Sequence, residues 1–230
     1  MLRLAGFFLL CILLLGILRQ VPLVGEVFRV PLVGFWLTAI LLSVLFSKVA
    51  ASALDRRRVK NLERRLGAVD TPHNQGKLGS LMLAQERHRR ARELLERAVA
   101  GEPASIEWRY RLGCARLGMR DWAAAIESLA SAARDDEEHA YGAVLLRLAE
   151  AYTRAGDARR ALECLARFER NHGPSPESAF RRGLALKAAG QGSEARAAFG
   201  EVARLSEQQA RYQRRSSLGW VARAFLARWV

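Results

Sequence analysis

Basic residues recur at a nearly constant interval after residue 70. Four of them are almost evenly spaced along the chain, and they are Lys77, Arg111, Arg147 and Arg181. A large apolar residue directly precedes the last three, at Tyr110, Leu146 and Phe180. Lys and Arg bind carboxylates through charge-assisted hydrogen bonds. If the fold aligns these residues, they form a groove for a segment with acidic and apolar side chains or for a terminal carboxylate. The alternative is a basic surface that only confers solubility.

Residue types that commonly catalyse reactions or bind metals show no such pattern. The histidines and cysteines lie far apart and lack metal-ligand spacing; they are His73, His88, His139, His172, Cys11, Cys114 and Cys164. Three separated cysteines also give no disulfide framework, which favours a reducing compartment. The acidic run at residues 135–139 lacks calcium-loop spacing, so we interpret it as a solvated loop rather than a divalent-ion site. The sequence predicts no catalytic residue, no metal and no cofactor.

Internal repeats are the elements that would position the basic residues. Frames of equal length begin at Pro72, Ile106, Gly142 and Pro176, with Ala140 and Tyr141 inserted between the second and third. Small residues recur at place eight (Gly79, Gly113, Ala149, Gly183) and place twenty (Ala91, Ala125, Ala161, Ala195), and large apolar ones at place twenty-four (Leu95, Leu129, Leu165, Phe199). Small residues at places eight and twenty let two antiparallel helices approach closely, and the large residues at place twenty-four are expected to fill the space between successive pairs. Turn signals at Arg120-Asp121, Gly156-Asp157 and Gly190-Gln191 mark where each pair reverses.

These columns resemble the tetratricopeptide repeat (TPR) family. The resemblance covers residues 72–209 as four units, 72–105, 106–139, 142–175 and 176–209. It implies an all-α solenoid in which the outward side of each first helix lines a concave groove, where the basic residues would form a ladder. Place four lacks the family's Trp, and place eleven is Arg116 in the second unit. The second and fourth units are therefore expected to pack more loosely.

Two uncharged, apolar runs occupy most of the N-terminal segment 1–47. Residues 4–18 and 30–47 are each bounded by basic residues, and inserting either run into a bilayer is favourable by several kcal/mol, about 0.3 to 0.6 for each Leu, Ile, Val or Phe. A single helix through both would span about twice the hydrocarbon core, and Pro22 and Pro31 would break it. The sequence thus predicts a transmembrane hairpin at residues 1–47. Cleavage of the first run as a signal peptide is the alternative, and it would move the repeats out of the cytoplasm.

A basic stalk and linker, residues 48–71, follows the hairpin. Val59, Leu62 and Leu66 recur at helical spacing. Five basic residues are predicted to lie at the membrane surface, or to act only as a stop-transfer signal, and they are Lys48, Arg56, Arg57, Arg58 and Lys60. With Arg64 and Arg65 they make seven basic residues, against two (Arg19 and Arg29) between the runs, which predicts that both ends of the chain and the repeats face the cytoplasm. The order of hairpin, stalk and repeats loosely resembles HemY-type bacterial membrane proteins, without implying their role in tetrapyrrole metabolism.

The C-terminal segment, residues 210–230, is predicted to form a helix that ends the array. Leu218, Val221, Phe225 and Trp229 share a face, and we expect this face to cover the last repeat because repeat arrays need a terminal cap. Residues 208–230 hold five Arg and no acidic residue. Contact with anionic lipid is therefore a second interpretation of the same helix.

The predicted function is that of a non-enzymatic scaffold at the cytoplasmic membrane, which binds a protein or peptide partner in the groove of its repeats. A formal net charge of +14 raises RNA-binding repeats as an alternative. Residues 1–71, however, hold 10 basic and 4 acidic residues and so contribute +6 of that charge. Nucleic acid is thus the less favoured partner. The sequence names neither the partner nor the oligomeric state.

Overall fold

A computed structural model describes Ser43 and residues 59–229 of the chain. The chain divides into two compact units, Met1–Arg64 and Arg65–Val230. No strand occurs among the described residues, which confirms the prediction of an all-α fold.

The predicted membrane segments fall largely outside the described residues. Within the runs 4–18 and 30–47, only Ser43 is described, and it is helical. Among the helices that are described, none combines the length and the apolar character needed to cross a membrane. Four of the five residues predicted at the membrane surface also lie outside the described part of the chain: Lys48, Arg56, Arg57 and Arg58. The fifth, Lys60, is exposed on a helical segment at residues 59–67.

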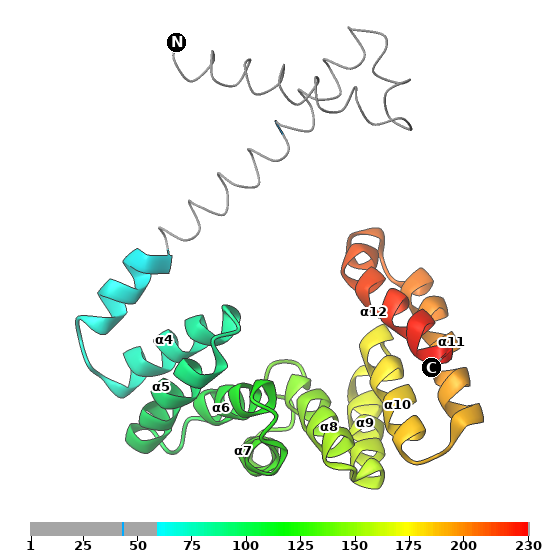
Figure 1. Cartoon of the computed structure of the whole chain (residues 1–230), viewed down its shortest axis with the longest axis horizontal. Helices are drawn as coiled ribbons and strands as arrows, with labels where there is room; N and C mark the ends of the chain where they lie inside the picture. Colours follow the sequence, from blue (N-terminus) through cyan, green and yellow to red (C-terminus); the bar gives the residue numbers. More distant parts are fainter. Residues whose placement is uncertain (1–42, 44–58, 230) are drawn as a thin grey trace, which may run out of the picture. The chain divides into compact units, whose positions relative to one another are not determined.

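The compact unit Arg65–Val230 contains a series of helix pairs that follow one another in chain order (Figure 1). The pairs are α4 (Pro72–Ala84) with α5 (His88–Gly101), α6 (Ile106–Gly118) with α7 (Trp122–Asp135), α8 (Ala143–Ala155) with α9 (Ala158–His172), and α10 (Pro176–Ala188) with α11 (Gly192–Gln208). The helix α12 (Arg211–Trp229) follows. Each helix packs on the next, and the first helices of neighbouring pairs also touch. The core is accordingly split into three clusters along the array, as expected when each unit contacts only its neighbours.

Within each pair, a small residue on the first helix faces a large one on the second. A Cβ added at three of the place-eight glycines would lie too close to the place-twenty-four side chain: 2.7 Å for Gly79 and Leu95, 2.5 Å for Gly113 and Leu129, and 2.4 Å for Gly183 and Phe199. The place-twenty alanines are at most 2% exposed. The small-residue columns therefore mark the contact between the two helices of a pair, as predicted. The place-twenty-four side chains, which were expected to fill the space between successive pairs, lie in this contact as well.

The reversal within each pair uses one left-handed residue. Its φ is positive in all four pairs: Glu86 (59°), Arg120 (64°), Gly156 (87°) and Gly190 (78°). The backbone N–H of Asp121 then donates to the carbonyl of Arg116 at 3.0 Å, which satisfies an end-of-helix carbonyl. The Asp121 side chain also accepts from the N–H of Ala124 and so caps the next helix. The predicted turns are thus confirmed, although only two of the four left-handed positions hold glycine.

Arg116 does not loosen the packing of the second repeat, residues 106–139, contrary to expectation. Its guanidinium donates to the Ser128 hydroxyl at 2.8 Å and to the Ala124 carbonyl at 3.2 Å, and it pairs with Glu96 at 3.4 Å. One side chain thereby ties α6 to both α5 and α7. A tryptophan is also present, one place earlier than in the family pattern: Trp108 is 6% exposed and fills the space over Gly76 on α4.

The acidic run at residues 135–139 ends α7 and continues into a partly exposed turn, in agreement with its interpretation as a solvated loop, and its side chains also bridge two repeats. Asp135 pairs with Arg109, and Glu137 with Arg167. Glu138 pairs with His172 at 3.0 Å, and His139 with Glu107 at 2.8 Å. The run therefore joins α6 to α9 across the two-residue insertion. The insertion itself is compact, because Ala140, Tyr141 and Gly142 all have positive φ.

The helix α12 packs on the last pair through a face other than the predicted one. Ala224 and Ser217 are buried, and Trp220, Val221 and Ala227 are partly buried against α10 and α11. Leu218 and Phe225, which were expected to face inward with Val221, are 61% and 64% exposed. Two contacts fix this rotation: the Ser206 and Ser217 hydroxyls lie 2.6 Å apart, and the rings of Phe180 and Trp220 lie 5.5 Å apart.

Candidate functional site

The basic column predicted from the sequence lies on the first helices α4, α6, α8 and α10. Lys77 is exposed on α4, and the side chains of Arg111 and Arg147 are 36% and 42% exposed. The side chain of Arg181 is only 6% exposed. The expected ladder of four outward cations is therefore interrupted at its last position.

Two clefts run along the surface of the first helices, and we call them together the first-helix groove. Tyr110, Arg111, Cys114, Arg147 and Glu150 help to line the first cleft, of about 470 Å³. Arg147, Glu150, Phe180, Arg181 and Trp220 help to line the second, of about 310 Å³. Both clefts share Arg147 and Glu150, and the first cleft is also lined by Leu83, so the groove is continuous from the end of α4 to α12 and touches all four repeats.

Two predicted groove residues lie outside both clefts. Lys77 lines neither of them. Leu146 is 7% exposed and belongs to the central core cluster. Its position next to Arg147 in the chain turns it by about 100° on the helix, which is enough to point it into the core.

Acidic side chains that the sequence interpretation missed neutralise most of the groove cations. Arg111 pairs with Glu107, four residues earlier. Arg147 reaches Glu150 at 3.0 Å, and Arg181 reaches the same Glu150 oxygen at 2.6 Å. Arg181 also reaches Glu177 at 2.7 Å. The signal was present in the sequence, because Glu107 and Glu177 precede their arginines by one helical turn.

Glu150 is the central anion of the groove. Burial by itself would raise the pKa of its carboxyl, but Arg181 and Arg147 outweigh burial and hold that pKa below its ordinary value of 4.5. Glu150 is therefore ionised at neutral pH, and it is shared by two guanidinium groups. Arg147 is the more exposed of the two and is the one able to turn toward an incoming carboxylate.

The polar groups beside Arg147 are protonated at neutral pH. Burial raises the pKa of the Tyr110 hydroxyl to about 12, and it also raises the pKa of the Cys114 thiol. Cys114 is thus held as a thiol rather than as the thiolate that nucleophilic or metal chemistry requires. The Tyr110 ring lies edge-on to His139, with 5.3 Å between ring centroids. Across residues 59–229, no three His, Cys, Asp or Glu side chains come together as metal ligands would.

The helix α12 closes the far end of the groove. The Arg181 guanidinium lies 5.7 Å from the centroid of the Trp220 ring, and the Phe180 ring packs between Trp220 (5.5 Å) and Phe199 (5.8 Å). Arg181 therefore serves to hold the cap, and the aromatic surface of Phe180 and Trp220 forms the end wall of the second cleft.

Comparison with known proteins agrees with this architecture. A tetratricopeptide repeat family model matches residues 143–175. Among solved structures, a thermophilic TPR protein of Thermus thermophilus is 18% identical with a TM-score of 0.60, and the alignment covers 79% of this chain and 95% of that one. MamA from Desulfovibrio magneticus RS-1 is 16% identical with a TM-score of 0.60, over 72% of this chain and 95% of that one. A TPR protein of Parabacteroides merdae is 15% identical with a TM-score of 0.58, over 78% and 75% of the two chains. No curated protein sequence matches significantly.

The repeats have the TPR fold. Identities this low support the fold alone.

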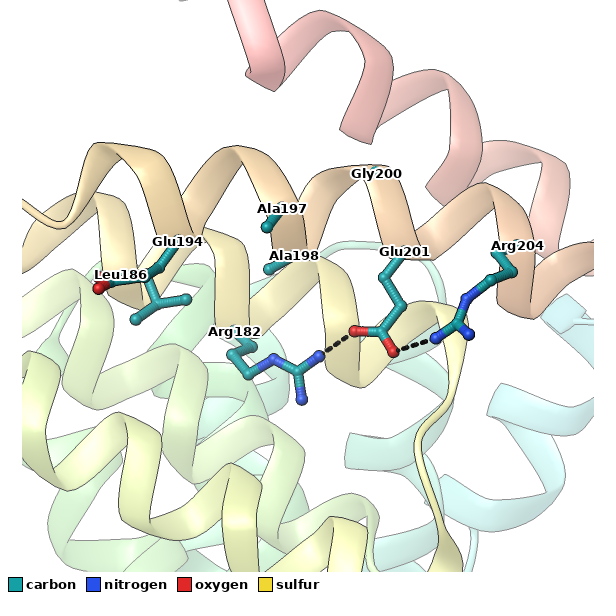
Figure 2. Close-up of a pocket in the computed structure, with 8 residues that line it drawn as sticks. All are labelled: Arg182, Leu186, Glu194, Ala197, Ala198, Gly200, Glu201 and Arg204. Carbon is teal, nitrogen blue, oxygen red and sulfur yellow. Dashed lines mark hydrogen bonds and ion pairs between the residues drawn. The ribbon is translucent and has the colours of Figure 1, made fainter.

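A larger cleft of the TPR array, about 610 Å³, lies on α10 and α11 (Figure 2). Figure 2 shows Glu201 between Arg182 and Arg204, and it lies 2.8 Å from Arg204. Arg182 also reaches Glu169 on α9 at 2.6 Å. These charges are used in joining helices, and the cleft is confined to one repeat. The first-helix groove touches all four repeats and is the better candidate for an extended partner.

Proposed function

We propose that this protein is a non-enzymatic scaffold that holds a protein or peptide partner in the first-helix groove. The observation that carries the proposal is the junction of the two clefts at Arg147, whose side chain is 42% exposed. A segment lying across this junction would contact three consecutive repeats. TPR arrays use such stacked surfaces for binding protein segments.

The chemistry of the groove favours a partner with both acidic and apolar side chains. A carboxylate of the partner would be bound by Arg147 and Arg111, in competition with Glu150 and Glu107. Since the internal acids already weaken the basic field, charge alone would bind weakly. Apolar side chains of the partner would add contact area against Tyr110 in the first cleft and against Phe180 and Trp220 in the second.

We further propose that the TPR array works at the inner face of a cytoplasmic membrane. Support comes from the sequence: the two apolar runs at residues 4–18 and 30–47, and the basic stalk that includes Lys60. Protease added to sealed cells should leave the repeats intact, and the mature chain should retain the first apolar run. Digestion of the repeats, or a mature N-terminus near Gln20, would show export instead.

Partner binding is tested by reversing the charge of the two accessible groove arginines. Crosslinking in intact membranes first identifies the proteins that the chain holds. The double variant Arg111→Glu and Arg147→Glu should lower affinity for the true partner by about tenfold or more, since each lost charge-assisted hydrogen bond is worth about 1.5–3 kcal/mol. Affinity is measured by titration with the purified partner, and thermal unfolding checks that the array remains folded.

The matched control reverses two exposed arginines on second helices, Arg134→Glu on α7 and Arg170→Glu on α9. This control makes the same change in net charge and should bind normally. An equal loss of affinity in both double variants would mean that net charge governs binding, which would contradict the groove proposal. Retention on RNA that falls steeply with salt, and shows sequence preference, would favour the RNA-binding alternative.

A further inference from the structure

The helix α12 has two apolar faces, whereas a cap needs only one. Its inner face packs on α10 and α11 through Trp220, Val221 and Ala224. On the other side, Leu218, Phe225 and Leu226 are 61%, 64% and 67% exposed. These three are half of the six most exposed large apolar side chains in the described part of the chain. The terminal unit of a soluble array normally has a polar outer face, so this face needs a different explanation.

The three exposed side chains form one stripe. At about 100° per residue, Leu218 and Phe225 are separated by only about 20° around the helix axis, and Leu226 extends the stripe to about 100°. Such a stripe along a single helix is long enough for several apolar side chains to enter the same surface at once.

Arginines without a carboxylate partner border the stripe. Arg214 and Arg215 lie one turn before Leu218, Arg228 lies three residues after Phe225, and all three are exposed. Within residues 59–229, none of these three guanidinium groups has a carboxylate partner, and Arg214 donates only to the backbone carbonyls of Glu207 and Gln209. The helix contains no Asp or Glu at all. Its outer side therefore carries charge of a single sign around an apolar centre.

We propose that the outer face of α12, made by Leu218, Phe225, Leu226, Arg214, Arg215 and Arg228, binds the surface of an anionic lipid bilayer. The apolar stripe enters the boundary between headgroups and acyl chains, and the arginines bind lipid phosphates. This inference is separate from partner binding in the first-helix groove, because the residues involved do not overlap.

Charge decides against a second copy of the chain as the occupant. In a two-fold contact between α12 helices, the arginines bordering each stripe would face one another without any acid on either helix to offset them. The surface of a single terminal helix is also convex, which suits a planar bilayer better than it suits an extended segment. An anionic lipid surface supplies both the negative charge and the apolar layer.

The test uses the full chain reconstituted into vesicles of phosphatidylcholine, with or without phosphatidylglycerol. A trace of lipid with a photoreactive acyl chain reports contact, and crosslinked peptides are located by mass spectrometry. Crosslinks within residues 213–229 should appear with phosphatidylglycerol and fall about tenfold or more without it. Because the readout is local, insertion of residues 1–47 does not obscure it.

Two variants and two controls complete the experiment. The variants Leu218→Gln with Phe225→Gln, and Arg214→Gln with Arg215→Gln and Arg228→Gln, should each lose the crosslinks on α12. All five side chains are exposed. Arg214 also donates to the backbone carbonyls of Glu207 and Gln209, so thermal unfolding checks that each variant stays folded. The triple control Arg89→Gln, Arg134→Gln and Arg170→Gln changes net charge equally and should keep them. The groove variant Arg111→Glu with Arg147→Glu should also keep the lipid crosslinks on α12. The lipid proposal and the groove proposal can therefore fail independently.

Three results would overturn the lipid proposal. The first is crosslinking on α12 that is equal with and without phosphatidylglycerol. The second is crosslinking that survives both sets of α12 substitutions. The third is hydrogen-exchange protection of residues 213–229 that rises with protein concentration in the absence of vesicles, which would identify a second copy as the occupant.

Discussion

The contact inside a helix pair and the groove that crosses the pairs differ in how regularly the repeat pattern determines their residue environments. Inside three of the four pairs the same contact recurs: a place-eight glycine fits beneath a large place-twenty-four side chain, as Gly113 does beneath Leu129. In the groove, one column of basic residues has four environments. Lys77 is exposed, Arg111 pairs within its own helix, Arg147 joins two clefts, and Arg181 is buried beneath α12.

The difference follows from the reach of the contacts. A pair contact involves two helices that are consecutive in the chain, so each repeat carries its own partner residues with it. A groove residue instead meets side chains of neighbouring repeats and, at the end, of the cap. Its burial and charge partners therefore depend on its position in the array and not on its place in the repeat.

The largest effects are expected inside a pair, and a double-mutant cycle between Gly113 and Leu129 tests this. Leu129→Ala should cost about 2–5 kcal/mol of unfolding free energy because the side chain is fully buried. Gly113→Ala should cost about 1–3 kcal/mol, since its Cβ would lie 2.5 Å from the Leu129 Cγ. In the Leu129→Ala background the same change should be neutral or stabilising. Urea unfolding measures all four proteins.

Gly200→Ala provides the control for that cycle. Gly200 also lies within a helix, but a Cβ there meets nothing within 4 Å. The substitution should stabilise the array by about 0.5–1 kcal/mol through helix propensity alone. Additive losses for Gly113→Ala and Leu129→Ala would show that the columns do not mark a direct contact.

Intermediate effects should separate two arginines of the same column. Arg181→Ala should cost about 1–3 kcal/mol of unfolding free energy, because Glu150 and Glu177 lose a partner and Trp220 loses one of its two cations. Arg147→Ala should change stability by less than about 1 kcal/mol, as its ion pair is accessible to water. Thermal and urea unfolding measure both. A larger loss for Arg147→Ala would contradict the burial of Arg181 as the reason for the difference.

The smallest effects should come from the left-handed turn residues. Arg120→Gly should stabilise the array by at most about 1 kcal/mol, because the positive φ of 64° strains a residue with a Cβ. Gly156→Ala, at a φ of 87° with open space around it, should destabilise by a similar amount. Urea midpoints of the two variants should therefore move in opposite directions. Shifts of the same sign would mean that the turns contribute through side-chain contacts instead.

The sequence alone determined the helical repeats and their turns. Small residues at fixed places predicted which helices pair, and Arg120-Asp121, Gly156-Asp157 and Gly190-Gln191 predicted where they reverse. These features depend on residues within one repeat, and local spacing on a helix is enough to relate such residues. The basic column was also visible, as were the glutamates one turn before Arg111 and Arg181.

Only the tertiary structure decided how that column is used and which way α12 faces. Burial of Arg181 needs Trp220, which lies beyond the last repeat on α12, and the sharing of Glu150 joins α8 to α10. For α12, periodicity offered an apolar face containing Leu218 and Phe225, yet packing of Trp220, Val221 and Ala224 turned that face outward. A helix with two apolar faces has no local signal that distinguishes inside from outside, because the choice depends on which face fits the surface it meets.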